Sequence, residues 1–285
     1  MQTVEYKINE QGIVTLVLDV KGQESNVLST VLMDDLESSI DKINQDDKIK
    51  GVIITSAKND FMVASDVNGV KSTISGSEIE EKFATSRRFS LLLRSLELCG
   101  KPVVVALNGS ALGSGLELAL AGNYCIATDD SQAVVGLPEV TLGLSPSAGG
   151  TQRLPRMIGL DQSLPLLMQG GSISFQEAKD LGIINELVAK DQLLASAEAW
   201  LLSDQAVAEK AWDIRGYKFD NSVKSRGDGT FMIQSSLLLT QTIKGGMTAA
   251  PKAILCSLYE GGRISIDKAL SVESQYALQL IETLG

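Results

Sequence analysis

Apolar and polar positions in the first half of the chain follow the two periods that distinguish strands from helices. Residues 4–8 and 13–19, VEYKI and IVTLVLD, alternate or run apolar on either side of Gly12, which predicts a hairpin. Residues 25–44 and 77–98 carry apolar side chains at helical spacing and predict two helices. Uninterrupted apolar runs predict buried strands at residues 50–56, 101–107 and 124–128.

This order of strands and helices predicts an α/β fold, in which helices cover a sheet. After Gly143 the pattern changes, and residues 160–203 and 231–284 are expected to be nearly all helical, with a break at Gly261–Gly262. The polar segment 212–230 between them is expected to be an excursion or linker. Active sites of α/β folds lie in loops that follow the carboxyl ends of strands, so the candidate chemistry is sought there.

Composition restricts the class of function. The 285 residues are 44% hydrophobic, enough for a packed core, and the net charge of −10 argues against nucleic acid or an anionic membrane as the main partner. Three separated cysteines form neither a disulfide framework nor a metal motif. The sequence starts without a signal-peptide pattern and contains no apolar run of membrane-span length, so we expect a cytoplasmic protein.

The chain contains no histidine, which narrows the chemistry further. Ser-His-Asp and Cys-His sites and a His-ligated metal centre are therefore excluded. Any general acid–base catalysis must use Asp, Glu, Lys, Tyr or Cys.

The stretch NDFMVASDV, residues 59–67, follows a predicted strand and ends in small residues. Small side chains at Ala64 and Ser65 let a ligand approach the backbone, where peptide N–H groups donate hydrogen bonds. The alternative is an ordinary loop in which Asp66 caps a helix.

The stretch ALNGSALGSGLELALAGNY, residues 106–124, places glycines at 109, 113 and 115 between a strand and a helix, followed by a single acid, Glu117. The spacing GxxxGxG does not fit the GxGxxG of dinucleotide-binding turns, and a first-turn carboxylate would repel a pyrophosphate. We interpret the stretch as a helix start whose amides stabilise an oxyanion while Glu117 transfers protons. The alternative is a glycine-rich helix start in which Glu117 is only a favourable first-turn acid.

A third stretch, residues 134–159, contains Glu139 between Pro138 and further apolar residues. We expect this carboxyl group to be partly buried, which raises its pKa toward the range of a general acid. The alternative is a loop glutamate paired with Arg153 or Arg156. The segment SAGGTQRLP within this stretch predicts a second glycine-rich helix start.

In their order and spacing these three stretches, with SNVLS and AKDLGIINELV, resemble the signature blocks of the crotonase (enoyl-CoA hydratase/isomerase) superfamily over residues 1–200. The resemblance implies a crotonase-like spiral of ββα units that binds an acyl-CoA thioester. Coenzyme A would arrive as part of the substrate, with no other cofactor and no metal.

Residues 201–285 contain WDIRGYKF and a long helical run from Ala250 to Ile281. These segments resemble the connector in the alpha subunit of the fatty-acid oxidation multifunctional enzymes, and the 22-residue separation of Glu117 and Glu139 fits their long-loop branch. Such chains continue into an NAD-dependent 3-hydroxyacyl-CoA dehydrogenase domain. We therefore expect a hydratase/isomerase core over 1–200 and a helical extension over 201–285, in either an excised amino-terminal part or a natural short form. A dehydrogenase domain and a thiolase subunit are the implied partners.

The resemblance assigns an oxyanion hole to the backbone N–H groups of Ser65 and Ser114, with substrate contacts at four neighbouring residues, Ala64, Asp66, Gly113 and Gly115. It implies that Glu117 orients and deprotonates a water molecule and that Glu139 delivers a proton to C2 of a trans-2-enoyl thioester. The same pair would also move a double bond between C3 and C2, as an isomerase does.

Three positions depart from the family pattern: Ala64, Ser114 and Ser147 each stand where glycine is usual. The Ser114 hydroxymethyl group points toward space normally left for the thioester, so a non-catalytic or weakly active acyl-CoA-binding or assembly module is the competing interpretation. Cations for the CoA phosphates are expected among three lysines, Lys58, Lys71 and Lys101. Three apolar residues are more typical of core packing than of an acyl tunnel: Val70, Leu142 and Leu144.

Overall fold

The computed structural model describes residues 3–65, 79–219 and 248–283 of the 285-residue chain. Asp66, Val70 and Lys71 therefore lie outside the described residues. So does most of the polar segment 212–230, whose first part holds the short 3-10 helix η3 (Ala211–Asp213).

The predicted α/β architecture is confirmed. The main sheet has six strands in the order β1-β2-β4-β6-β8-β11, in which β1 pairs antiparallel with β2 and the other neighbours are parallel. In the same order the strand bounds are Val4–Ile8, Ile13–Leu18, Gly51–Ser56, Val103–Leu107, Tyr124–Thr128 and Glu186–Val188. Two small sheets complete the fold: β10 (Ser172–Ser174) with β9 (Val134–Gly136) and β7 (Ala111–Leu112), and β3 (Val27–Leu28) with β5 (Ala64–Ser65).

The central strands are apolar along most of their length because both faces of the main sheet are covered. On one face, Ile53 and Val104 pack against α8 (Leu193–Leu201). Their sequence neighbours Val52 and Val103 point to the opposite face and belong to the larger core. The helices that contribute to this larger core include α1 (Thr30–Gln45), α3 (Ile79–Glu97) and α4 (Ser114–Ala121).

The first helix begins later than the predicted range 25–44. Ser29 caps α1 by accepting a hydrogen bond from the N–H of Leu32, and Val27–Leu28 form β3 instead of a helical turn. The preceding Asn26 side chain is fully buried and holds the chain in this extended path. Its amide nitrogen lies 3.2 Å from the Leu18 carbonyl oxygen and 3.0 Å from that of Phe61, and its side-chain oxygen accepts from a further backbone N–H, that of Val20.

The expectation of a nearly all-helical segment at 160–203 is wrong at two places. The segment contains α6 (Leu160–Gln169), α7 (Phe175–Asp180) and α8, but β10 and β11 lie between them. Each of these strands has only three residues, too few to show a period-two pattern. Pairing with β9 and β8 makes them strands, and that pairing is tertiary.

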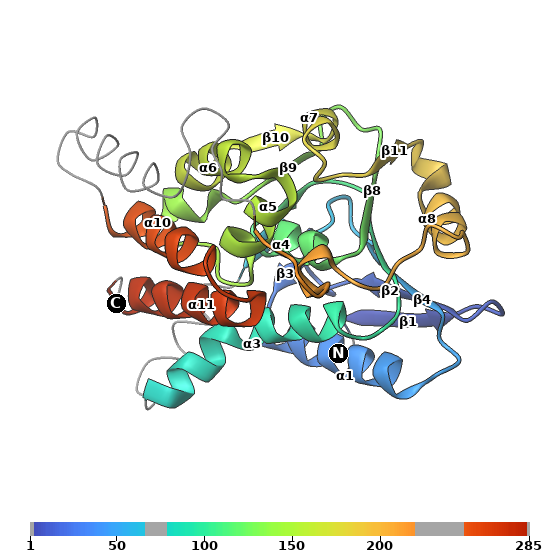
Figure 1. The fold of residues 1–285 in the computed structure, drawn as a ribbon. Coiled ribbons are helices and arrows are strands. Elements are labelled where there is room, and N and C mark those ends of the chain that lie inside the picture. Colours follow the sequence, from blue (N-terminus) through green and yellow to red (C-terminus); the bar gives the residue numbers. More distant parts are fainter. Residues whose placement is uncertain (1–2, 66–78, 220–247, 284–285) are drawn as a thin grey trace.

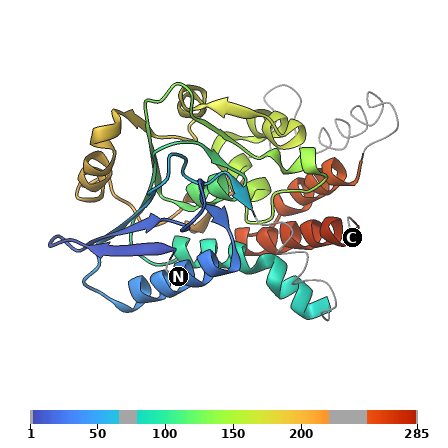
Figure 2. The same cartoon turned by 180° about the vertical axis from the view of Figure 1, so that it is seen from behind.

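The break near Gly261–Gly262 is confirmed, because α10 (Ala249–Gly261) ends there and α11 (Ile266–Thr283) follows. These two helices lie side by side at one end of the molecule, coloured red in Figures 1 and 2. α11 also packs on α3 and on α5 (Gly150–Ile158), while α10 packs on α5 and α6. The carboxy-terminal helices therefore share the core of the preceding domain. Of the helices in the described ranges, none is long and apolar enough to cross a membrane.

Asn26 generates a prediction about stability. Asn26→Ala leaves two buried carbonyls without their donor, so we expect the free energy of unfolding in urea to fall by about 2 kcal/mol. The exposed Asn44 of α1 supplies the matched control, because Asn44→Ala is expected to change that free energy by no more than about 0.5 kcal/mol. Equal losses in the two variants would contradict the role given to Asn26.

Candidate active site

The first turn of α4 is built by a close approach between two backbones. A Cβ atom on Gly115 would lie 2.2 Å from the Met62 carbonyl oxygen, so only glycine lets α4 start against the chain that leads into β5. The N–H of Leu112 donates to that same oxygen at 2.9 Å. The glycine spacing singled out in the sequence therefore serves to bring the start of α4 beside β5.

The two predicted oxyanion donors belong to these neighbouring elements. Ser114 is the first residue of α4, its side chain is nearly buried, and it lines a cavity described below. Ser65 ends β5, which pairs in parallel with β3 and packs against α4. Gly113 precedes α4 with a positive φ of 55°, and Ala64 is the other residue of β5. The oxyanion hole at Ser65 and Ser114 stays a prediction. So do the substrate contacts at Ala64, Asp66, Gly113 and Gly115.

Glu117 is buried and is held by a second glycine-rich turn. Its Oε1 accepts hydrogen bonds from the N–H of Ala148 at 2.7 Å and from that of Gly150 at 2.9 Å. Burial raises the pKa of the Glu117 carboxyl above its ordinary value, and these amides together with nearby Arg153 act in the opposite direction. The helix start predicted from SAGGTQRLP is α5, and it supplies these amides.

Glu139 reaches the same place from the 3-10 helix η1 (Pro138–Leu142). A Cβ atom on Gly113 would lie 2.9 Å from Glu139 Oε1, so this carboxyl group lies against the start of α4. Burial, followed by repulsion from the Glu117 and Glu273 charges, raises the pKa of Glu139 to about 8. Glu139 Oε2 is buried and has no hydrogen-bond partner within the described part of the chain. The expected partial burial is confirmed. The alternative pairing with Arg153 or Arg156 does not occur within the described residues, where Arg153 binds Glu97 and Arg156 binds Gln152 and the Gly261 carbonyl oxygen.

Both glutamates and Ser114 open into one cavity of about 110 Å³. Ser145 and Ser147 add polar groups beside the glutamates. The rest of the wall is mainly apolar. Leu28 of β3, Met33 of α1 and Phe89 of α3 form one part of it, and Leu144 after η1 with Ala277 and Ile281 of α11 forms another. The cavity thus joins two carboxyl groups to an apolar surface, as a site for proton transfer on an apolar substrate requires.

A buried ion pair supports the turn that holds Glu117. Arg153, in α5, is fully buried and binds both oxygens of Glu97, in α3, at 2.8 and 2.9 Å. A third nitrogen of the same guanidinium group donates to the Ala148 carbonyl oxygen. Arg94, one turn before Glu97, continues the network to Asp267 of α11 at 2.7 Å. Ala148, whose N–H donates to Glu117, is therefore also held through its carbonyl oxygen.

Two further charged residues support the site and were missed in the sequence. Lys210 is buried, and its Nζ donates to the carbonyls of Leu120 and Gly122 at the carboxyl end of α4. Burial lowers the pKa of Lys210 to about 8. Glu273 in α11 is fully buried and binds the turn at the start of α5. A signal for Glu273 did exist, because it shares the apolar stripe of its helix with Leu270 and Ala277.

The other residues considered from sequence fall in different surroundings. Lys58 forms an ion pair with Asp19 at 2.9 Å. Lys101 precedes the amino end of β6, and its Nζ donates to the Ile43 carbonyl oxygen, so it lies away from the carboxyl end of β6 where α4 begins. Leu144 is 8% exposed and lines the cavity, whereas Leu142 is 63% exposed, so the core interpretation is wrong for Leu142.

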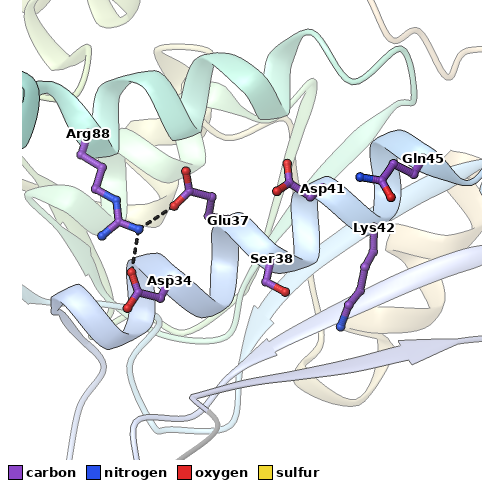
Figure 3. Close-up of a pocket in the computed structure, with 7 residues that line it drawn as sticks. All are labelled: Asp34, Glu37, Ser38, Asp41, Lys42, Gln45 and Arg88. Atoms are coloured by element: carbon purple, nitrogen blue, oxygen red, sulfur yellow. Dashed lines mark hydrogen bonds and ion pairs between the residues drawn. The ribbon is translucent and has the colours of Figure 1, made fainter.

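A second hollow lies beside α1, away from the cavity that holds the two glutamates (Figure 3). There Arg88 of α3 binds Asp34 at 2.6 Å and Glu37 at 2.5 Å, and both acidic side chains are more than half exposed. Charges in such a solvated place interact weakly. Throughout the described ranges, no group of three His, Cys, Asp or Glu side chains is arranged to hold a metal ion.

The comparison with known families agrees with this geometry. The sequence model described as enoyl-CoA hydratase/isomerase matches residues 9–245. Among solved structures, an enoyl-CoA hydratase from Bacillus anthracis superposes with a TM-score of 0.63 at 26% identity, covering 96% of this chain and 89% of the other. An enoyl-CoA hydratase from Geobacillus kaustophilus, 23% identical with a TM-score of 0.64 over 97% and 87% of the two chains, shares the fold. The chain therefore belongs to the enoyl-CoA hydratase/isomerase family and has the crotonase fold.

Curated relatives are larger proteins. The fatty acid oxidation complex subunit alpha of Shewanella sp. strain ANA-3 is 30% identical over 275 residues, which are 95% of this chain and 38% of the relative. That of Vibrio campbellii is 39% identical over 193 residues, which are 67% of this chain and 27% of the relative. This chain thus spans less than two-fifths of the length of the relatives it matches.

The buried pair generates a second prediction. Glu97→Gln leaves the Arg153 charge buried without its partner, so we expect the free energy of unfolding to fall by about 3 kcal/mol. The matched control is Glu37→Gln in the exposed hollow, which is expected to cost no more than about 0.5 kcal/mol. Denaturation in guanidinium chloride measures both values. A loss in Glu97→Gln as small as that of the control would show that the pair does not hold the turn.

Proposed function

We propose that this chain hydrates trans-2-enoyl-CoA thioesters to 3-hydroxyacyl-CoA in fatty-acid oxidation. The observation that carries the proposal is the convergence of Glu117 and Glu139 on one cavity at the start of α4. Membership of the enoyl-CoA hydratase/isomerase family supports it, as does similarity to an enoyl-CoA hydratase and to fatty acid oxidation complex alpha subunits.

In the proposed reaction the two carboxyl groups have different protonation states. Glu117 acts in its ionised form, which the two peptide N–H groups on its Oε1 and nearby Arg153 favour against the effect of burial. In that form it orients a water molecule and takes a proton from it. The water oxygen forms a bond to C3 as the C2–C3 π electrons move toward the thioester. Glu139 enters protonated and gives its proton to C2, which completes the addition of water. Exchange with solvent restores both groups after the product leaves.

Negative charge develops on the thioester oxygen between these two proton transfers. The backbone N–H groups of Ser65 and Ser114 are the proposed donors to that oxygen, because β5 and the start of α4 pack together beside the glutamates. Each such donor contributes about 3 kcal/mol to transition-state stabilisation in sites of this kind. The Ser114 side chain lines the cavity and limits the groups that fit there.

The same arrangement supports isomerisation as a second activity. Glu139 Oε2 is buried and carries no hydrogen bond within the described residues, so it is suited to exchange a proton with substrate carbon. Moving a double bond from C3 to C2 needs only removal of one proton and its return two carbons away.

We also propose association with a 3-hydroxyacyl-CoA dehydrogenase domain and a thiolase subunit, because the similar proteins are named as subunits of a fatty acid oxidation complex.

Replacement of either glutamate tests the proposal. We expect Glu117→Gln and Glu139→Gln each to lower kcat for crotonyl-CoA and for a longer trans-2-enoyl-CoA by about 100-fold or more, because each loses a proton-transfer group. Loss of the enoyl thioester absorbance measures turnover, and Glu37→Gln serves as the surface control. A wild-type chain that binds acyl-CoA without turnover would refute the hydratase and favour the binding or assembly module.

The raised pKa of Glu139 generates a pH prediction. Glu139 acts as the acid only while protonated, and with its pKa raised to about 8 it keeps its proton at neutral pH and loses it above that value. The hydration rate should therefore fall as the pH rises through about 8, and Glu139→Gln should lack this alkaline limb. Profiles of kcat/KM over about pH 5 to 10 measure it. A wild-type rate that stays level up to pH 10 would exclude Glu139 as the acid.

A further inference from the structure

Four successive peptide N–H groups at the start of α5 donate hydrogen bonds alternately to two glutamate side chains. Those of Ala148 and Gly150 donate to Glu117, at 2.7 and 2.9 Å. Those of Gly149 and Thr151 donate to Glu273, at 2.5 and 2.8 Å. Gly149 has a φ of 110°, which favours glycine and turns successive amides to opposite sides. Glu117 and Glu273 therefore hold one turn from its two sides.

The Glu273 side of the turn is as ordered as the Glu117 side. Glu273 Oε1 also accepts from the Thr151 hydroxyl at 2.6 Å. That hydroxyl lies 2.9 Å from the Ser257 hydroxyl of α10, and the Gln152 amide donates to both hydroxyl oxygens. Every one of these side chains is buried. Both carboxy-terminal helices thus contact the turn at the start of α5 through a network of buried hydrogen bonds.

The charges around Glu273 have an unusual balance for a buried acid. Glu117 of α4 and Glu139 of η1 repel it, while Arg153 and Arg156 of α5 attract it. Arg153 is itself bound to Glu97 of α3. Burying an acid beside two other carboxyl groups lowers the stability of the fold. A residue that breaks a stability rule in this way is expected to serve the function of the site.

We propose that Glu273 is a positioning residue for the proposed hydration: by holding the Gly149 and Thr151 amides it fixes the turn whose Ala148 and Gly150 amides aim Glu117 at the substrate. The inference rests on the proposed function and deepens it. It makes α11, whose Ala277 and Ile281 line the cavity, part of the machinery that orients the catalytic base.

Glu273→Gln is the main test. The glutamine oxygen can still accept from Thr151, but its NH2 group faces the Gly149 N–H, so the turn loses one of its anchors. We expect kcat for crotonyl-CoA to fall by about tenfold or more while KM changes by less than about threefold, because displacement of a catalytic group affects the transition state most. Because the pKa of Glu273 is itself raised to about 8, its negative charge develops in the pH range of the alkaline limb. Removing that charge should lower the pKa of Glu139 and move the limb to lower pH.

Two further variants separate position from charge and from folding. Glu282→Gln removes an exposed acid from the same helix and should leave kcat unchanged. Glu273→Asp keeps the charge but withdraws it from the turn, so kcat should fall while the alkaline limb stays in place. It also carries the test if Glu273→Gln does not fold. A kcat within about twofold of wild type in a folded Glu273→Gln or Glu273→Asp variant overturns the proposal.

Amide hydrogen exchange gives a readout that needs no turnover. In Glu273→Gln or Glu273→Asp we expect exchange to quicken by about tenfold or more at Ala148 and Gly150 as well as at Gly149 and Thr151. Faster exchange confined to Gly149 and Thr151 would mean a local structural role and overturn the proposal. Absence of hydration by the wild-type chain would refute the proposed function instead, and the exchange result would still decide whether Glu273 fixes the amides that bind Glu117.

Discussion

The hydrogen bonds between the Glu117 carboxylate and the peptide N–H groups of Ala148 and Gly150 are the interaction on which the site depends. They join α4, which follows the central strand β6, to the start of α5, which belongs to the second half of the domain. A carboxylate that accepts two charge-assisted bonds has a fixed orientation, which a side chain on a single helix does not have by itself. The glycine-rich sequence at 147–150 is what lets the backbone turn closely enough to provide them.

Burying three carboxyl groups together is unfavourable, and the surrounding structure offsets part of that free energy. Glu117, Glu139 and Glu273 all have raised pKa values, chiefly because burial disfavours their charged forms. Arg153 is the compensating cation, and Glu97 keeps its guanidinium in place. At Glu117 two peptide N–H groups and Arg153 act against this rise, whereas Glu139 Oε2 has no hydrogen-bond partner within the described residues. We propose one group as base and the other as acid on this difference in surroundings.

The helical extension is part of the site as well as of the fold. α11 packs on α3 and α5, contributes apolar side chains to the cavity wall and places a buried acid on the active-site turn. The division into a core over 1–200 and an extension over 201–285 stays a prediction. In the structure, side chains from both parts pack into one hydrophobic core. An account of substrate preference in this chain therefore has to include residues more than 100 positions beyond the two glutamates.

The sequence by itself determined most of the local elements and limited the possible chemistry. Period-two and period-3.6 patterns located the hairpin, the buried strands and the break near Gly261, and the lack of histidine limited general acid–base catalysis to Asp, Glu, Lys, Tyr or Cys. It singled out Glu117 and Glu139 as well, because each stands in a glycine- or proline-bearing stretch after a strand. Only the tertiary structure decided that β10 and β11 are strands, that Asn26 holds an extended path into β3, and that Glu273 meets the same turn as Glu117. The physical reason is that these depend on partners distant in the chain, and hydrogen bonds across such separations leave no periodic trace in a single sequence.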